Sequence, residues 1–165
     1  MKRCFTLLVA CLAFHLHFFA QDLGRMDSNS RKSYLVKTAR EVSETFGPGY
    51  AEYFEAPVLS DIQVFDENVY GDKPKMQKHF GRKYYTVTFP YDTAQVRMEF
   101  NFAARVTIWE DTGQPMDVIF GNGYGRNFFS LTYRQQTENK DSIIQVPFQK
   151  IIEPEVPYNP LEKTP

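Results

Sequence analysis

The clearest pattern of apolar and polar positions in the chain has the period of an α-helix. Leu35, Ala39, Val42 and Phe46 follow one another at spacings of four, three and four residues, which places them on one stripe of a helix. A Gly-Pro-Gly sequence follows and does not support a continued helix. The pattern therefore predicts an amphipathic helix over residues 30–46. Its stripe must be buried against another part of the chain, because a helix of this length is marginally stable alone.

From residue 83 onward apolar and polar residues alternate, as they do in β-strands. The alternation predicts strands over residues 83–89, 96–108, 116–120, 128–134 and 143–148. The longest of these runs carries the following apolar residues: Val96, Met98, Phe100, Phe102, Ala104, Val106 and Ile108. Short turn sequences separate the runs, and short connections favour antiparallel neighbours. We therefore expect an antiparallel meander of about five strands.

One helix followed by a meander predicts the α+β class, with the helix packed on one face of a curved sheet. This outline is similar to that of cystatin-like domains, at the level of architecture only. Residues 30–152 are expected to form a single domain after a polar leader at 21–29. Within the domain, residues 61–65 are expected to add a short strand and residues 66–82 to form a long loop. The proline-rich tail at 153–165 is expected to run extended.

The first twenty residues have the layout of a cleavable export signal. Lys2 and Arg3 precede an apolar run over residues 5–20, and a polar sequence follows. An uncleaved membrane anchor and a lipoprotein attached through Cys11 are the alternatives, but Cys11 comes early for a lipoprotein signal. Both cysteines lie in this segment, so the mature domain would contain none. These features predict a periplasmic or extracellular protein, and they favour a bacterial envelope.

The overall charge and the weak motifs exclude several classes of function. Without the signal, 17 basic residues stand against 20 acidic ones, which gives no argument for binding nucleic acid or an anionic membrane surface. No membrane span is expected after cleavage of the signal. The glycines at 121–125 are expected to form a hairpin turn rather than a phosphate loop, with positive φ angles shared among the glycines and Asn122. The segment 66–72 resembles only the front half of a calcium loop. His79 is expected to be exposed in a basic patch, so no metal or cofactor is predicted.

Carboxylates offer one enzymatic alternative. Glu110, Asp111 and Asp117 flank the same predicted hairpin and could meet for acid and base chemistry, as in a carboxylate-dependent hydrolase. No base partner or nucleophile stands near them in the sequence, so the main expectation is a protein that is not an enzyme.

Aromatic residues give the strongest indication of a binding surface. Tyr84, Trp109 and Phe128 occupy the strand positions opposite to the main core, so they are predicted to share one exposed face. Arg126 and Asn127 stand beside them in sequence. We therefore expect a non-catalytic exported domain that binds another macromolecule, either a protein partner or an extracellular carbohydrate. Two alternatives remain: a small-ligand or carbohydrate module with these rings as its platform, and a second small core in which residues 50–65 or the tail cover this face.

Overall fold

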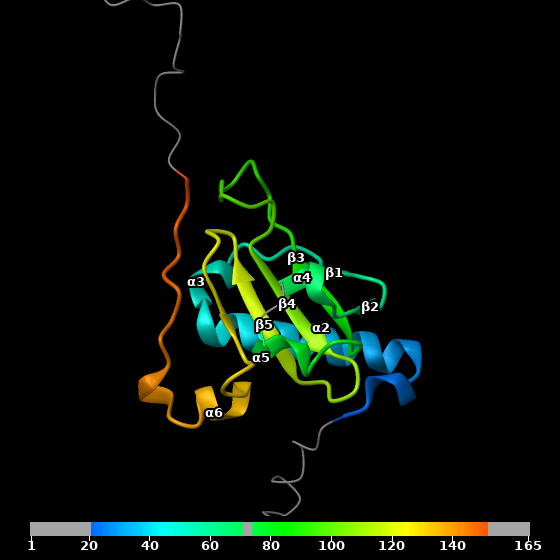
Figure 1. Ribbon diagram of the computed structural model, residues 1–165. Helices are drawn as coiled ribbons and strands as arrows, with labels where there is room; N and C mark the ends of the chain where they lie inside the picture. The colour runs from blue at the N-terminus through cyan, green and yellow to red at the C-terminus, as the bar shows by residue number, and fades with distance from the viewer. Residues whose placement is uncertain (1–20, 71–73, 152–165) are drawn as a thin grey trace, which may run out of the picture.

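The computed structural model describes residues 21–70 and 74–151 and shows an α+β fold, as predicted (Figure 1). The predicted signal, residues 1–20, and the predicted tail, residues 153–165, lie outside the described residues. The helical elements are η1 (Leu23–Arg25), α2 (Ser28–Phe46), α3 (Pro48–Ala51), α4 (Glu67–Tyr70), α5 (Pro74–Gln77), α6 (Tyr133–Thr137) and η2 (Lys140–Ser142). The strands are β1 (Val58–Leu59), β2 (Gln63–Val64), β3 (Lys83–Phe89), β4 (Ala104–Trp109), β5 (Pro115–Phe120) and β6 (Gly125–Asn127).

The long helix α2 begins two residues earlier than predicted because Asp27 caps it. The Asp27 side chain accepts hydrogen bonds from the backbone N–H groups of Asn29 and Ser30, at 3.0 and 3.1 Å. The helix ends at Phe46, as the following Gly-Pro-Gly sequence predicts. Its predicted apolar stripe is buried, so the basis of the helix prediction is confirmed.

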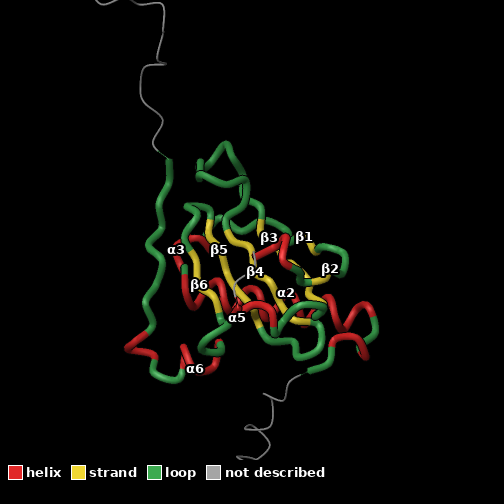
Figure 2. The backbone as a smooth tube through the Cα atoms, in the orientation of Figure 1, coloured by secondary structure: helices red, strands yellow, loops and turns green. Residues whose placement is uncertain are grey.

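The sheet is antiparallel and open, and its strand order is β1-β3-β4-β5-β6. Strand β2 also pairs with β3, next to β1. Val87 of β3 stands opposite Val106 of β4, which stands opposite Val118 of β5. Helix α2 lies across the face that carries these valines, and Figures 1 and 2 show it behind the central strands. The main core therefore lies between α2 and this inner face of the sheet.

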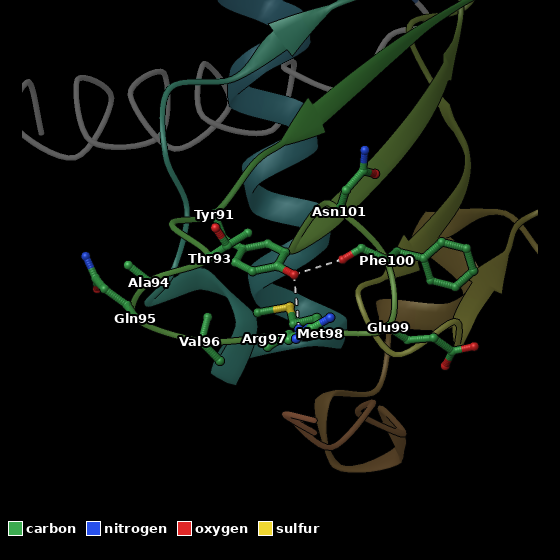
Figure 3. Close-up of a pocket in the computed structure, with 10 residues that line it drawn as sticks. All are labelled: Tyr91, Thr93, Ala94, Gln95, Val96, Arg97, Met98, Glu99, Phe100 and Asn101. Atoms are coloured by element: carbon green, nitrogen blue, oxygen red, sulfur yellow. Dashed lines mark hydrogen bonds between the residues drawn. The ribbon is translucent and has the colours of Figure 1, made fainter. Parts of the chain in front are cut away.

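The predicted strand over residues 96–108 is wrong in its first half, because only Ala104–Trp109 is a strand. Residues 92–103 form a loop that Tyr91 holds in place (Figure 3). The Tyr91 hydroxyl donates to the Phe100 carbonyl at 3.1 Å and accepts from the Met98 N–H at 3.0 Å. Met98 is buried while Phe100 is exposed, so the alternating sequence is only partly matched by alternating burial.

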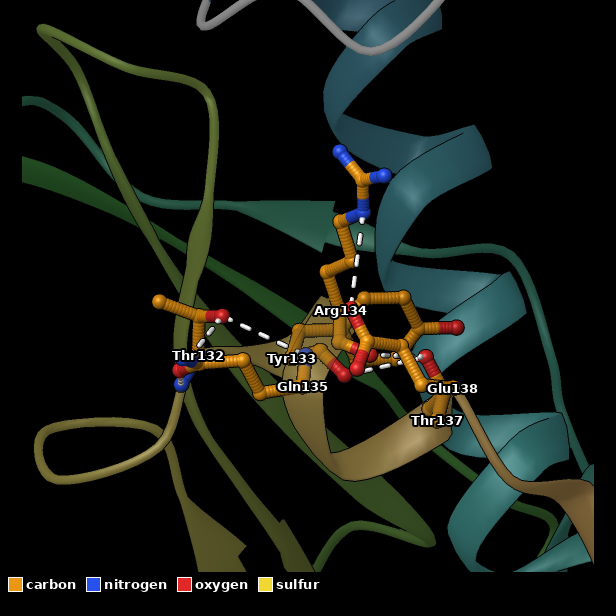
Figure 4. A network of polar contacts seen from close by, with 6 residues as sticks. All are labelled: Thr132, Tyr133, Arg134, Gln135, Thr137 and Glu138. Carbon is orange, nitrogen blue, oxygen red and sulfur yellow. Dashed lines mark hydrogen bonds and ion pairs between the residues drawn. The ribbon is translucent and has the colours of Figure 1, made fainter.

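Two further strand predictions are wrong. Within residues 128–134 the chain turns into α6, which begins with a capping box (Figure 4). There the Thr132 hydroxyl accepts from the Gln135 N–H, and the Gln135 side chain accepts from the Thr132 N–H. Residues 143–148 are extended but form no strand. The predicted loop at 66–82 contains the short helices α4 and α5, and the predicted strand at 61–65 is only the two residues of β2.

Residues 21–29 do not form a leader clear of the domain. The Gln21 N–H donates to the Thr112 carbonyl at 2.9 Å, and the Leu23 N–H donates to the Glu110 carbonyl at 2.8 Å. Leu23 is fully buried in the main core. The segment is therefore part of the fold, attached to the turn between β4 and β5.

The glycine-rich sequence at 121–125 makes the turn between β5 and β6, which confirms its structural interpretation. Gly123 has a φ of 80°. Asn122 does not share this role, because no described residue other than glycine has a positive φ. Its side chain instead accepts a hydrogen bond from the Tyr124 N–H at 3.1 Å.

Candidate functional site

The outer face of the sheet, opposite to α2, is divided into a closed aromatic part and an open polar part. The closed part is a second core made by Phe65, Tyr84, Trp109 and Met116. Phe65 enters it from the segment that follows β2, and its ring lies 5.3 Å from that of Trp109. Met76 and Phe80 also pack against this core, so the described part of the chain between β2 and β3 covers one end of the outer face.

A chain of polar contacts ties this covering segment to the turn between β4 and β5. The Arg82 guanidinium donates to both carboxylate oxygens of Asp111, at 2.7 and 3.0 Å. Its third nitrogen lies 3.0 Å from Nδ1 of His79, and its carbon lies 3.9 Å from the centre of the Trp109 ring. A bidentate ion pair stacked on tryptophan is a strong arrangement for holding a segment in place.

His79 is not the exposed residue that the sequence predicts. Its ring stacks on Trp109 at 5.4 Å, and its Nε2 atom is buried with no hydrogen-bond partner among the described residues. Burial, with help from the nearby charges of Arg82 and Lys78, lowers the pKa of His79. The folded protein therefore favours the neutral form of His79. The resulting stability is fully present above the ordinary histidine pKa and is lost as the pH falls through the lowered pKa.

The predicted aromatic platform is not an exposed surface. Tyr84, Trp109 and Phe128 are only 7%, 5% and 7% exposed. The first two belong to the second core, whereas Phe128 belongs to the main core and packs 5.6 Å from Phe46. The alternative interpretation, a second core covered by the chain, is confirmed for the part that Phe65 covers.

Arg126 and Asn127 lie on strand β6. The Arg126 guanidinium donates to the Ile144 carbonyl at 3.0 Å, and the Asn127 carbonyl accepts from the Gln136 side chain at 2.8 Å. Both residues line a hollow of about 430 Å³ beside α6. Their described contacts attach the C-terminal part of the chain, so the prediction that they bind a ligand stays untested.

Residues 143–151 run along the side of the domain that carries β6, where the Arg126 contact to Ile144 attaches them, and form the orange segment in Figure 1. The Val146 N–H donates to the Phe46 carbonyl at 2.6 Å, and the Tyr50 hydroxyl donates to the Pro147 carbonyl at 3.1 Å. Phe148 stacks on Tyr53 at 5.0 Å. These contacts attach the segment to the end of α2 and to the region of α3, whereas Gly125 and Asn127 of β6 stay exposed.

The opposite edge, formed by β1 and β2, has no further strand beside it among the described residues. Three aliphatic side chains are exposed there: Val58, Ile62 and Val64, at 58%, 44% and 53%. Uncovered edge strands with apolar side chains can pair with another chain. This segment is named the β1–β2 edge below.

The open part of the outer face lies next to this edge and forms a recess of about 360 Å³. Its lining is mostly polar and comes from several strands: Ser60, Gln63, Tyr84, Thr86, Thr88, Arg105, Thr107 and Met116. Thr88 stands opposite Arg105, and Thr86 stands opposite Thr107, so β3 and β4 place four of these side chains in one block. This group of eight residues is called the polar recess.

Sequence reasoning missed the polar recess because threonines and an arginine at alternate strand positions are typical of any solvent-facing side. The structure shows instead that Thr107 is buried and that Arg105 lies against Phe102, with 4.2 Å between its guanidinium carbon and the ring centre. The Nε atom of Arg105 is buried and has no hydrogen-bond partner in the described part of the chain.

Asp117 is the one strongly perturbed acid on this face. It stands opposite Thr107 on β4, whose backbone hydrogen-bonds to its carboxylate. Burial nevertheless raises the pKa of Asp117 to about 7. The predicted grouping of carboxylates gains no support, because Asp111 is paired with Arg82 and Glu110 lies against Gly24.

Other hollows and clusters in the described residues give weaker candidates. A further hollow, about 650 Å³, is lined by the single loop 91–101 (Figure 3). Among residues 21–70 and 74–151, no three His, Cys, Asp or Glu side chains are grouped so that they could hold a metal ion. Helices in that same part of the chain are too short or too polar to cross a bilayer. In the segment that resembles half a calcium loop, the Asp66 carboxylate accepts a hydrogen bond from the Asn68 N–H at 2.9 Å, which is typical of a turn.

No family model matches the chain, and neither the curated proteins nor the solved structures contain a match to it.

Proposed function

We propose that this chain is an exported, non-catalytic domain that binds an extended segment of a protein partner in or on the cell envelope. The observation that carries the proposal is the difference between the two edges of the sheet. Residues 143–151 lie beside β6 and contact it through Arg126, whereas the β1–β2 edge has no strand beside it among the described residues and carries three exposed aliphatic residues. An extended segment can add to such an edge through backbone hydrogen bonds, with specificity from pockets beside it.

The polar recess supplies such a pocket. It begins at Ser60 and Gln63, on the β1–β2 edge, and extends over the outer face to Arg105 on β4. A segment lying on the edge therefore has polar side chains within reach as well as aliphatic ones.

Export rests on the sequence of residues 1–20, with its basic start and apolar run. Leu23, three residues after this segment, is buried in the main core. The absence of cysteine after residue 20 favours a bacterial envelope over a eukaryotic secretory route, because small extracellular domains usually carry disulfides.

The two alternatives have less support. A carbohydrate module with Tyr84, Trp109 and Phe128 as its platform needs exposed rings, and these are buried. A carboxylate-dependent hydrolase needs at least two acids in one pocket, and neither the polar recess, the hollow beside α6 nor the hollow of loop 91–101 contains two acids.

Site-specific photocrosslinking tests the proposal. A photoreactive residue in place of Val64 is expected to give one crosslinked protein in native envelopes, with the crosslink mapped to one short partner segment. Leu131 provides a matched control, since it is 55% exposed against 53% for Val64 but lies beside α6. The control position is expected to give no such product.

A charge substitution provides the second arm of the test. Val58→Lys places a charge on the β1–β2 edge and is expected to weaken capture of the crosslinked partner by about tenfold or more. Leu131→Lys is expected to leave capture unchanged. Equal crosslinking from positions 64 and 131, or capture that tolerates a lysine at position 58, would contradict the proposal.

A further inference from the structure

Arg105 combines three properties that are seldom found in a solvated surface arginine. Its guanidinium packs on the nearly buried ring of Phe102, its Nε atom is buried without a hydrogen-bond partner, and it lines the polar recess. No described residue forms an ion pair with it. Stacking on an aromatic ring holds the planar group in one orientation, which prepares it for an acceptor with two oxygens.

The neighbours of Arg105 are hydrogen-bonding groups of matching chemistry. Thr88 lies directly opposite it on β3, and Thr86 and Thr107 form the next pair along the same two strands. The described residues provide no hydrogen bond to the hydroxyl of any of these threonines. Threonine hydroxyls can donate to an anion that a guanidinium binds, so the block presents several donors in one direction.

From this arrangement we propose that Arg105, Thr86, Thr88 and Thr107 form a subsite for a carboxylate of the bound partner. The inference rests on the proposed function, because it assigns the chemistry of the partner at the same face. A carboxylate fits better than a phosphate dianion for reasons of charge. Arg105 is the only cation in the lining of the recess, and the acid Asp117 stands opposite Thr107 on the same face.

A pair of short peptides tests this subsite directly. The probes are Ac-Val-Glu-Val-Glu-Val-NH₂ and its glutamine counterpart, which has the same shape without charge. The glutamate peptide is expected to bind about tenfold or more tightly, since a hydrogen bond to a charged group is worth more than a neutral one. It is also expected to shift the NMR signal of the Arg105 Nε–H group, whereas the glutamine peptide should shift it little.

Variants of Arg105 separate a binding role from a structural one. Arg105→Gln is expected to remove the preference for glutamate while leaving the affinity for the glutamine peptide unchanged. Arg105→Lys should restore only part of the preference, because an ammonium group cannot bind two oxygens side by side. The fluorescence of the single tryptophan, Trp109, reports whether each variant is folded.

The outcomes distinguish failure of the subsite from failure of the proposed function. Equal affinity of the glutamate and glutamine peptides, with both weakened by Val58→Lys, would overturn the subsite and leave the edge proposal standing. A glutamate preference that depends on Arg105 but ignores Val58→Lys would support the subsite and contradict binding at the edge. Acetate and inorganic phosphate serve as small probes, and tighter binding of phosphate would overturn the assignment of a carboxylate.

Discussion

Replacing Asp117 by asparagine is expected to raise the free energy of unfolding by about 2 to 4 kcal/mol at pH 8. Asp117 is nearly buried, and burial raises its pKa from the ordinary value of 3.8 to about 7. Above pH 7 the native protein holds a charge in a poorly solvated position, whereas the unfolded chain solvates it freely. Asparagine has almost the same shape and carries no charge, so the variant avoids this cost.

The sign of the pH dependence follows from the raised pKa. The unfolded chain loses the Asp117 proton near pH 4 and the folded protein near pH 7, so the destabilisation grows between these values and is complete above pH 7. The stability difference between Asp117→Asn and the wild-type protein should therefore be small at pH 4 and largest at pH 8.

Chemical denaturation at a series of pH values provides the measurement for Asp117. Asp61→Asn is the matched control, because Asp61 is exposed in the connection between β1 and β2. That variant should follow the wild-type stability closely at every pH. A stability difference for Asp117→Asn that does not grow with pH would show that this carboxyl group is well solvated in the folded protein.

Replacing Trp109 by alanine is expected to lower the free energy of unfolding by about 3 to 5 kcal/mol. Its ring is 5% exposed and contacts Phe65, His79 and Phe129 in or around the second core. It also forms the surface on which the Arg82 guanidinium stacks. Removal of the ring therefore leaves a cavity and loosens the segment that covers this end of the sheet.

Tyr124→Ala provides the comparison for Trp109, because Tyr124 is an aromatic residue with 67% exposure. Its loss is expected to change stability by no more than about 0.5 kcal/mol. Thermal unfolding of the two variants beside the wild-type protein measures the contrast. If Trp109→Ala were as stable as Tyr124→Ala, the second core would contribute little to the fold.

The elements that were predictable from the sequence are those whose local pattern and tertiary burial agree. Helix α2 and strands β3 and β5 belong to this group, because most of their apolar residues pack in the main core. The run 96–108 misled for a physical reason: Val96, Met98 and Phe102 are buried by a loop that folds back, not by a strand. The capping box at Thr132 and Gln135 was visible in the sequence and would have indicated α6.

The candidate site was less predictable, because it depends on which part of the outer face the chain covers. Alternation places Tyr84, Thr86, Arg105 and Trp109 on the same side of the sheet. Only the path of the segment around Phe65 decides that Tyr84 and Trp109 are buried while the space beside Arg105 stays open. That path is a tertiary property with no local sequence signal.

The fluorescence of Trp109 tests most directly whether the outer face is divided in this way. It is the only tryptophan in the chain, so its emission reports one position. A ring buried in the second core should emit at a clearly shorter wavelength than in the unfolded protein and should be quenched little by acrylamide. Emission and quenching like those of the denatured chain would place the ring in solvent. That result would contradict the second core and the division of the outer face into a buried aromatic part and an open polar recess.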